Sequence, residues 1–296
     1  MNRLKNFTMK KFEYYKPKSL TEVWELKEKI PNSRFIAGGT DVMVKIKSGL
    51  LIPEALISLR EVPELKNISV GKNIRIGAGS TITELIENAE LQTAIPVLVQ
   101  AARRIGSLQI RNVATVGGNL GNCSPCADTA PALLVLEARA VVRSDKNTRE
   151  MPLQDFFTGP GTSCLSAKEI LVELIIDIPS PQTKAISMKK GRVQMDLALA
   201  SVAVLMETDG NFCKKIRVAA GSVAPVPLRL IEVEKFLENT EITEEKIKEA
   251  QRIAMESVSP ISDVRTTADY RRHLVGVYVK NSIQSLMNGG RHEKRN

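Results

Sequence analysis

Two glycine pairs, each followed by a polar side chain, are the residues of this sequence best suited to ligand chemistry. The first lies in residues 37–41 (AGGTD) and the second in residues 115–119 (TVGGN). Paired glycines allow positive φ and remove the Cβ atoms that keep a ligand away from the backbone amides. Successive amides can then converge on an anion, either as a nest or as the exposed donors of a helix start. A pyrophosphate fits that description, and a plain tight turn is the alternative for either pair alone.

Neither glycine pair has the spacing of the Rossmann motif G-x-G-x-x-G or of the P-loop, so those nucleotide-binding folds are disfavoured. We expect instead that the two bends, far apart in the chain, come together in space. Their unpaired main-chain amides would then hold one diphosphate between them.

A Cys-x-x-Cys pair, Cys123 and Cys126, follows the second bend directly. A four-cysteine metal cluster would also need Cys164 and Cys213, but neither has a neighbouring cysteine or histidine. A redox-active disulfide is a second interpretation, although the strand and helix context of a thioredoxin-like unit is not evident. Small reduced thiols packed near the ligand are the third, and we expect these rather than a metal site.

Composition and charge narrow the class of protein. The 296 residues are 43% apolar, which is ample for a folded core. The net charge of +9 gathers at the two ends of the chain, and aromatic residues make up only 4%, so nucleic-acid binding is not expected. No apolar run approaches the roughly 18 residues that span a bilayer, and no signal peptide begins the chain, so we expect a cytoplasmic protein.

The elements that must position the bends can be read from hydrophobic periodicity. Ser19 and Glu22 form a capping box that predicts a helix from Leu20 to about Ile30. A short buried strand precedes the first bend, and further strands are predicted at residues 55–60 and 73–80. Residues 82–106 have helical spacing interrupted near Pro96, which predicts two consecutive helices.

The second half of the chain changes from strands to helices. Strands are predicted at residues 138–144 and 169–179, followed by a linker at residues 179–181 (PSP). Residues 197–223 predict two long strands joined by a tight turn at Asp209 and Gly210. Helical patterns then occupy residues 231–239, 243–258 and 268–287, which indicates an α+β carboxy-terminal domain.

Four motifs, in order, carry a family resemblance: FIAGGTDVM (35–43), GSLQIRNVATVGGN (106–119) with Asp128 nine residues later, EILVELIIDIP (169–179) and SVSPISDVRTTADYRRHLV (257–275). Together they resemble the FAD-binding subunit of the molybdenum hydroxylases, over about residues 10–287. The resemblance implies an α+β fold with a two-lobe FAD-binding domain of the p-cresol methylhydroxylase (PCMH) type at 10–180, its lobes split near 60–65. A small α+β domain at 181–290, a basic extension at 1–9 and a tail at 291–296 complete the expected organisation.

The resemblance also implies roles for individual residues. The loop expected to wrap the FAD pyrophosphate comprises Phe35, Ile36, Ala37, Gly38, Gly39, Thr40, Asp41 and Val42. The second phosphate loop comprises Thr115, Val116, Gly117, Gly118 and Asn119. Further contacts are implied for Asp128 with a polar group of the cofactor, for Leu171 and Ile105 on the two sides of the isoalloxazine ring, and for Lys189 near its edge, with Lys190 as the alternative. Without the resemblance, Leu171 and Ile105 would be ordinary core residues.

The sequence departs from the family pattern at two places. Relatives often carry small residues such as alanine where Cys123 and Cys126 stand. They also frequently place a Lys or Arg near residues 162–164 (TSC), which leaves in doubt a contribution of that charge to the phosphates.

The resemblance implies an electron-transfer subunit. Substrate would be oxidised at a molybdopterin cofactor on a large partner subunit, electrons would cross 2Fe–2S clusters on a third chain, and FAD here would pass them to NAD+ or oxygen. Xanthine or another purine is the first expectation for the substrate, nicotinate-like heterocycles the next, and a dimer of heterotrimers the expected assembly. No catalytic acid or base is implied on this chain. The alternative is a free-standing PCMH-type flavin oxidoreductase, for which Lys189, Lys190 and Arg192 are the obvious acid–base candidates.

Overall fold

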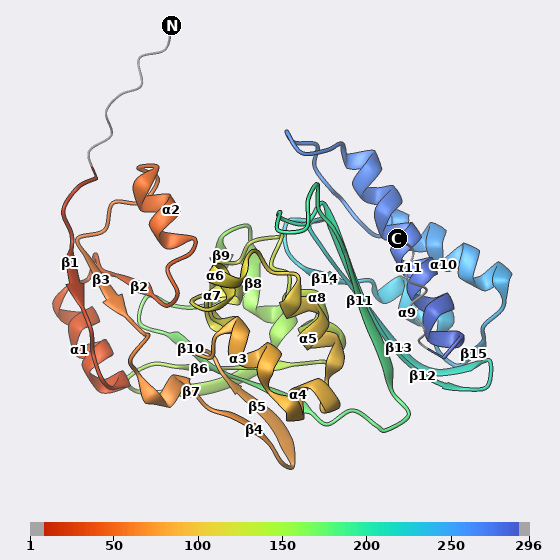
Figure 1. The fold of residues 1–296 in the computed structure, drawn as a ribbon, viewed down its shortest axis with the longest axis horizontal. Coiled ribbons are helices and arrows are strands. Elements are labelled where there is room, and N and C mark those ends of the chain that lie inside the picture. The colour runs from red at the N-terminus through yellow and green to blue at the C-terminus, as the bar shows by residue number, and fades with distance from the viewer. Residues whose placement is uncertain (1–8, 290–296) are drawn as a thin grey trace, which may run out of the picture.

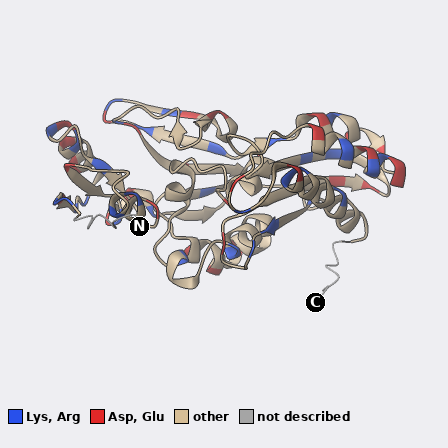
Figure 2. Ribbon diagram, turned by 90° about the horizontal axis from the view of Figure 1, so that it is seen from above, with Lys and Arg blue, Asp and Glu red and all other residues tan. Residues whose placement is uncertain are grey.

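The structure, a computed structural model, describes residues 9–289, so most of the expected basic extension and all of the expected tail lie outside the described residues. Three sheets with their helices follow one another along the long axis of the molecule (Figure 1). Along the ribbon of the carboxy-terminal helices, positions occupied by Lys or Arg alternate with positions occupied by Asp or Glu (Figure 2). Within the described range, no helix has both the length and the apolar composition required to cross a bilayer.

The first sheet forms a small lobe, here called the N lobe, that carries the first glycine bend. Its strands β1 (Glu13–Tyr15), β2 (Arg34–Ile36) and β3 (Ala55–Ser58) are parallel, in the order β1-β3-β2. Helices α1 (Leu20–Lys29) and α2 (Val42–Lys47) connect them. Leu20, Val23 and Trp24 of α1 bury one face of that helix in a cluster with Ile57 of β3. The same cluster includes Ile170 and Val172 of the second sheet, so the lobe shares this apolar core with that sheet.

The second sheet is antiparallel, in the order β4-β5-β10-β6-β7, with β10 at its centre. Its strands are β4 (Ile68–Val70), β5 (Asn73–Gly77), β6 (Arg139–Arg143), β7 (Thr148–Pro152) and β10 (Ile170–Asp177). Between β5 and β6 the chain forms six helices: α3 (Ile82–Glu87), α4 (Ala89–Ala94), α5 (Pro96–Arg103), α6 (Leu108–Arg111), α7 (Val116–Gly121) and α8 (Ala130–Val135). A two-stranded hairpin, β8 (Phe157–Gly159) and β9 (Thr162–Ser163), precedes β10, and short 3-10 helices lie at Pro63–Leu65 and Leu153–Phe156.

The third sheet consists of β11 (Lys184–Lys190), β12 (Ala200–Asp209), β13 (Phe212–Gly221) and β14 (Leu228–Arg229), with β15 (Thr240–Glu241) beside β13. Helices α9 (Ile231–Leu237), α10 (Glu244–Glu256) and α11 (Ala268–Met287) complete this part. Successive residues of β12 point to opposite faces: Val202 and Val204 pack in the core with α10 and α11, whereas Ala203 and Leu205 pack in the core of the second sheet and its helices. Both faces are buried, which explains the unbroken apolar run in this strand.

Two local predictions require correction. Ser19 does cap α1 by accepting from the Glu22 amide, but the Glu22 carboxylate accepts from the Lys18 amide, so the reciprocal half of the expected capping box is absent. Residues 82–106 form three helices rather than two. Asn88 ends α3 and its side chain caps α4 through the Leu91 amide, which adds a break that the apolar pattern did not reveal.

Candidate functional site

The two glycine bends meet in space although some 75 residues separate them in the chain. We call residues 37–42 the first bend and residues 115–119 the second bend. A Cβ atom on Gly38 would lie 2.8 Å from the Cα of Ala114 and would also strike the carbonyl of Val113. A Cβ atom on Gly118 would lie 3.7 Å from that of Ala37. The backbones therefore touch, and only glycine at position 38 permits this approach.

The first bend keeps its amides available. It begins after Ile36, whose carbonyl accepts from Leu59, and it leads into α2, where the Met43 amide donates to Gly39 at 3.0 Å. Between these points, none of the amides of residues 37–42 donates a hydrogen bond to another residue in the described range. Gly39 has φ of +74°, the left-handed conformation that lets consecutive amides turn toward one ligand.

The second bend does not offer its amides in the way the sequence suggested. Thr115 caps α7 by accepting from Gly118 at 2.9 Å. The amides of Val116 and Gly117 donate to Ser80 and Ala78, and that of Asn119 donates to Thr115. In this structure protein oxygens accept from the amides of residues 116–119, so the role of this bend as a second phosphate loop stays a prediction that would rely on its other polar groups. The second bend packs against the first bend. Its remaining free donor is the Nδ2 group of Asn119, which has no partner among the described residues.

A third glycine-bearing segment, missed by the sequence reasoning, lies beneath the second bend. A Cβ atom on Gly117 would lie 2.6 Å from that of Ala78, just after β5. The Ala78 amide donates to Val172 of β10 at 2.9 Å, and the hydroxyl of Ser80 is buried without a partner. The sequence GAGS at 77–80 was the available signal, since it repeats the small residues of the two bends.

Asp128 and Lys189 form a buried ion pair. The carboxylate oxygen Oδ2 lies 2.7 Å from Nζ of Lys189, with side chains 9% and 6% exposed. Nζ also donates to the carbonyl of Arg104 at 2.8 Å. Burial raises the pKa of Asp128 to about 6 although Lys189 favours the ionised form. The two residues that the resemblance assigned separately to the cofactor thus contact each other and join β11 to the loop before α8.

One atom of this pair is left for a further contact. Oδ1 of Asp128 is buried and has no hydrogen-bond partner. A buried carboxylate oxygen without a donor is costly, so a ligand that supplies one would be favoured there. The adjacent Thr129 hydroxyl donates to Oδ1 of Asn119 at 2.6 Å, which ties Asp128 to the second bend.

The predicted ring-flanking residues lie in different apolar clusters. Leu171 belongs to the main core of the second sheet, and Ile105 packs with Ile82, Ala102 and Ala114. Both are more than 90% buried, so in this structure they are core residues that do not face one another across a shared cluster. Phe35 likewise packs into the core of the N lobe, where Nζ of Lys27 lies 5.6 Å from its ring centroid.

Ile36, just before the first bend, and Val42, its last residue, pack in a separate cluster near α2, so their side chains anchor both ends of the bend. Thr40 and Asp41 are adjacent polar residues at its far end, with Thr40 Oγ1 3.4 Å from a carboxylate oxygen of Asp41. Lys45 of α2 reaches across to the end of α7, where Nζ donates to Oδ1 of Asn122 at 2.8 Å. A cation of the N lobe thus stands beside the second bend.

The cysteines make protein contacts. No disulfide joins any of the four, all of which lie in the described part of the chain. Burial raises the pKa of the Cys123 thiol to about 11, so it is protonated at neutral pH. Cys126 Sγ donates to the Ala198 carbonyl and accepts from Arg265, both at 3.7 Å, and Cys164 Sγ lies 3.4 Å from the sulfur of Met151. Across residues 9–289 no three His, Cys, Asp or Glu side chains gather as metal ligands would.

The late motif at 257–275 holds the carboxy-terminal part against the loop of Cys126. Asp263 pairs with both Arg265 and Arg271. Arg271 is 1% exposed and donates to the carbonyls of Leu199 and Ser222, which lie at the ends of the third sheet. The Ser222 amide in turn donates to Pro125 at 2.7 Å. The motif is therefore a support for the Cys-x-x-Cys loop, a role that the sequence did not reveal.

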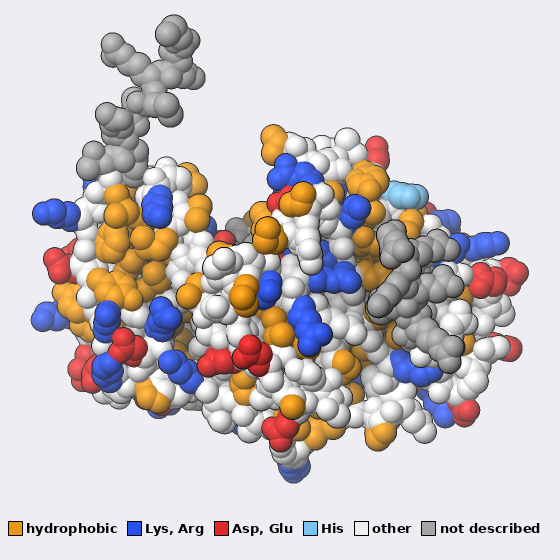
Figure 3. Space-filling view, viewed as in Figure 1, with side chains coloured by type: hydrophobic (Ala, Val, Ile, Leu, Met, Phe, Trp, Pro, Cys, Tyr) orange, Lys and Arg blue, Asp and Glu red, His pale blue; other side chains and the backbone are white. Residues whose placement is uncertain are grey.

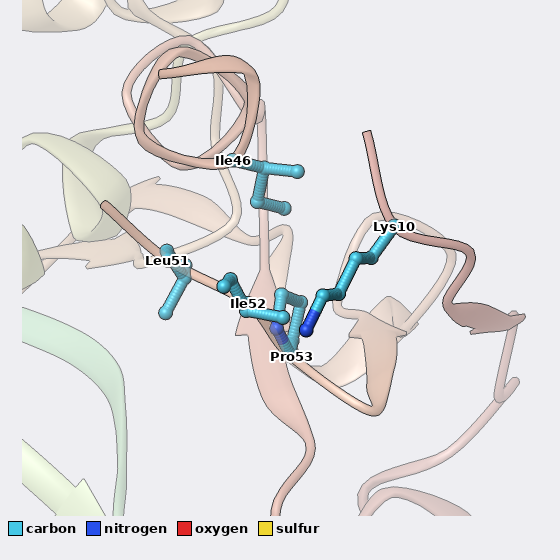
Figure 4. Close-up of a pocket in the computed structure, with 5 residues that line it drawn as sticks. All are labelled: Lys10, Ile46, Leu51, Ile52 and Pro53. Carbon is cyan, nitrogen blue, oxygen red and sulfur yellow. The ribbon is translucent and has the colours of Figure 1, made fainter. Parts of the chain in front are cut away.

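Two surface hollows lie near these segments. The smaller, beneath α2, has a volume of about 10 Å³ and is lined by Lys10, Ile46, Leu51, Ile52 and Pro53, so it admits a water molecule at most (Figure 4). The larger has a volume of about 180 Å³ and lies between the start of α6 and the loop after β11. Its lining includes Arg103 and Gly106, which flank Arg104 and Ile105 in the chain, and the Arg104 carbonyl accepts from Lys189.

The residues present fit a flavin dinucleotide. The unpaired amides of the first bend suit a diphosphate, and the glycines have no Cβ atoms to keep a ligand away from the backbone. Oδ1 of Asp128, which has no hydrogen-bond partner in the protein, could accept a hydrogen bond from the cofactor. These groups belong to one connected site. The first bend contacts the second bend, and the hydrogen bond from Thr129 to Asn119 ties the second bend to Asp128, which pairs with Lys189.

Comparison with known proteins agrees with this geometry. Residues 10–181 match the family model described as the FAD binding domain in molybdopterin dehydrogenase, and residues 187–286 match the CO dehydrogenase flavoprotein C-terminal domain. A nicotinate dehydrogenase FAD-subunit from Eubacterium barkeri is 32% identical, over 96% of this chain and 100% of that protein. A putative xanthine dehydrogenase FAD-binding subunit from Escherichia coli is 30% identical, over 93% of this chain and 95% of that one.

The fold agrees as well. Carbon monoxide dehydrogenase from Hydrogenophaga pseudoflava superposes with a TM-score of 0.91 at 30% identity, over 94% of this chain and 98% of that one. The α+β fold, an FAD-binding domain followed by a C-terminal domain, is thereby confirmed. The chain belongs to the molybdenum hydroxylase family, as an FAD-binding subunit.

Proposed function

We propose that this chain passes electrons through FAD from 2Fe–2S clusters of a partner subunit to NAD+, with oxygen as the alternative acceptor. The observation that carries the proposal is the contact between the two bends, which places the unpaired amides of residues 37–42 beside the second bend. Bound FAD supplies the redox chemistry, and the protein supplies binding, orientation and electrostatics. On this chain, the first bend would hold the diphosphate and Oδ1 of Asp128 would accept a hydrogen bond from the cofactor.

The full enzyme would be a dimer of heterotrimers in the cytoplasm, with an iron–sulfur subunit and a large molybdopterin subunit. The chain has four cysteines, which contact protein groups at scattered sites, so the clusters would belong to a partner. Xanthine or another purine is the proposed substrate of the large subunit, in line with the relative from Escherichia coli. The relative from Eubacterium barkeri supports nicotinate-like heterocycles as the next class.

Two of the three candidate acids and bases of a free-standing flavin oxidoreductase are already engaged, whereas the third, Lys190, is exposed. Lys189 is bound to Asp128 and to the Arg104 carbonyl, and Arg192 pairs with Asp196 at 2.6 Å. Lys189 or Arg192 would have to break one of these contacts to exchange a proton with a substrate, which leaves Lys190 as the available candidate for that alternative.

Anaerobic electron transfer tests the proposal. The purified chain should bind FAD in a one-to-one ratio and show flavin absorbance, yet xanthine alone should leave that absorbance unchanged. In the reconstituted complex, xanthine should bleach the flavin, and NAD+ should restore it faster than oxygen. A chain that binds no FAD would refute the assignment. Turnover of an organic substrate by the chain alone would instead establish the free-standing alternative.

A further inference from the structure

The hairpin of β8 and β9 brings the sulfur atoms of three residues together. Sγ of Cys164, directly after β9, lies 3.4 Å from Sδ of Met151 in β7. Both side chains are half-buried and pack against the core of the second sheet. The third sulfur is that of Cys123, which is 1% exposed in the same core and forms a hydrogen bond with the side chain of Ser163, the neighbour of Cys164.

The hairpin and the segment of Cys123 are also joined through their backbones. The Gly161 amide, in the turn between β8 and β9, donates to the Cys123 carbonyl at 2.9 Å. The Cys164 amide donates to the Phe156 carbonyl at 3.0 Å, which fixes the end of β9. The two cysteines, which are far apart in the chain, thus lie on adjacent segments of the fold.

A guanidinium group faces the two half-buried sulfurs. Nη2 of Arg149 lies 3.9 Å from Sγ of Cys164, and Nη1 lies 3.9 Å from Sδ of Met151. Two hydrogen bonds from Arg149 to the Glu169 carboxylate, at 2.7 and 3.0 Å, hold the group in place. A fixed cation repels a metal ion, so these sulfurs are poorly suited to bind one. Partly exposed thiols beside a cation are instead those that react with oxidants.

The other cysteines lack this combination. Burial raises the pKa of Cys123 and of Cys213 to about 11, so both thiols are protonated and hidden from solvent. Cys126 is half-buried beside Arg265, but its thiol donates to a backbone carbonyl and contacts no second sulfur among the described residues. Of the four cysteines, Cys164 alone combines partial exposure, a neighbouring cation and a second sulfur.

The surface in this part of the molecule suits a small reagent better than a protein. In the central region, where Figure 1 places β8 and β9, apolar side chains are interleaved with Lys and Arg on the face that Figure 3 shows. Apolar side chains scattered in this way do not mark a protein interface. Hydrogen peroxide is small enough to reach a half-buried sulfur. Two-electron reduction of oxygen, the alternative acceptor of the proposed function, yields this molecule.

We propose that hydrogen peroxide oxidises Cys164 to a sulfenic acid, which then condenses with the Cys123 thiol to a disulfide. In the first step the Cys164 sulfur attacks one peroxide oxygen, an S–O bond forms as the O–O bond breaks, and the leaving hydroxide takes up the thiol proton as water. In the second step the Cys123 sulfur attacks the Cys164 sulfur, the S–S bond forms, and the S–O bond breaks with loss of a second water. The two sulfurs together lose two electrons, which the peroxide gains. The bridge fixes the β8–β9 hairpin to the segment that follows α7.

Mass-spectrometric peptide mapping of the reduced full-length chain, after one equivalent of hydrogen peroxide, tests the proposal. With dimedone present, the sulfenic acid label should be found on Cys164. Without dimedone, a disulfide between Cys123 and Cys164 should accumulate. Because the Cys123 thiol is protonated at neutral pH, its attack is the slower step, and the sulfenic acid should precede the disulfide.

Variants separate the two steps. Cys123→Ser should keep the dimedone label and form no disulfide, and Cys164→Ser should lose both products. Cys126→Ser is the matched control, a half-buried cysteine beside an arginine, and should behave as wild type. Arg149→Met should slow labelling severalfold, since a cation stabilises the negative charge that develops on the departing hydroxide. Arg149→Lys keeps that charge and should restore most of the rate.

Three results would overturn it. Labelling of Cys126 in preference to Cys164 would show that a neighbouring second sulfur does not matter. Oxidation of Met151 to the sulfoxide, with all cysteines still reduced, would make the thioether the target. A Cys164 sulfenic acid that never yields the bridge, or a bridge between two copies of the chain, would refute the role of Cys123. The measurement needs neither flavin nor a partner subunit, so its failure would leave the proposed function intact.

Discussion

At the scale of single residues, Gly38 has the most stringent requirement in the site. Its position opposite Val113 and Ala114 leaves no room for a side chain, and the atoms in the way belong to backbone, which cannot swing aside. The contact between the two bends therefore depends on one missing methyl group. The first bend must keep this place for its amides to lie beside the second bend.

Gly38→Ala should separate the bends and weaken FAD binding. Overpacking against backbone costs about 1–3 kcal/mol, so we expect a loss of that size in the free energy of unfolding and a larger Kd for FAD. Urea denaturation and flavin titration measure the two effects. Gly121→Ala is the control, because a Cβ there meets nothing within 4 Å and its φ is not positive, so the change should be neutral or slightly stabilising. Equal behaviour of the two variants would contradict the close contact.

Residue types alone predicted which glycine pairs meet but not which amides stay unpaired. The pattern AGGTD and the pattern TVGGN look equivalent in sequence. Their difference arises from the segment at 78–80, which accepts hydrogen bonds from Val116 and Gly117. The Asp128–Lys189 pair was also beyond sequence reasoning, because 61 residues separate its members and only the packing of the third sheet brings them together.

At the scale of elements, strong hydrophobic periodicity predicted the helices and strands well, whereas the structure of glycine-rich segments could not be predicted from their composition. The strands β12 and β13 and their turn, where Gly210 has φ of +56°, follow the predicted hairpin, as α10 and α11 follow the helical patterns. Helix α7 (VGGNLG) has three glycines in six residues, a composition unfavourable to helices. The helix is stabilised instead by its Thr115 cap and by its hydrogen bonds to the segment at 78–80.

In the turn after α8, tertiary contacts again stabilise a backbone conformation that the local sequence does not favour. Glu137 has φ of +51°, a conformation that glycine would adopt more easily. Its carboxylate accepts from Lys215, Arg217 and Arg229 of the third sheet, at 2.8, 2.8 and 3.2 Å. Burial opposes ionisation, but the hydrogen bonds from Lys215 and Arg217 hold the pKa of Glu137 at about 2, below its ordinary value of 4.5. The strained turn persists because the acid links two sheets.

Because of this ionic link, we expect part of the free energy of unfolding to depend on pH in the acid range. Because the pKa of Glu137 is lower in the folded state, its stabilisation is complete above pH 4.5 and is lost as the pH falls from 4.5 toward 2. Its side chain is 42% exposed, so solvent screening limits the effect to about 1 kcal/mol. Glu137→Gln should be less stable than wild type at pH 7, with the difference shrinking below pH 4.5. Chemical denaturation across that window checks it, and a difference independent of pH would exclude the ionic origin.

At the scale of the whole molecule, the third sheet is built into the core of the FAD-binding domain. Ala203 and Leu205 of β12 and Ala219 of β13 pack in the same apolar cluster as α5 and α8. The Asp128–Lys189 pair and the Glu137 contacts cross the same boundary. By contrast, the covalent connection between β10 and β11 runs through residues 178–183, of which Ser180, Pro181 and Gln182 are exposed. The two parts are thus held together by their interface more than by the linker.

A chain cut in this linker should therefore remain one particle. We expect a protease site placed at residues 180–182 to be cleaved while both fragments elute together and retain FAD, since the buried apolar contact survives the cut. Leu205→Ala should make the cleaved fragments separate on dilution, because losing a buried leucine costs about 2–5 kcal/mol at that interface. Val204→Ala, on the opposite face of the same strand, should lower stability without promoting separation, since Val204 packs with α10 and α11. Fragments that part in the wild-type background would show that the linker, and not the shared core, holds the flavin site together.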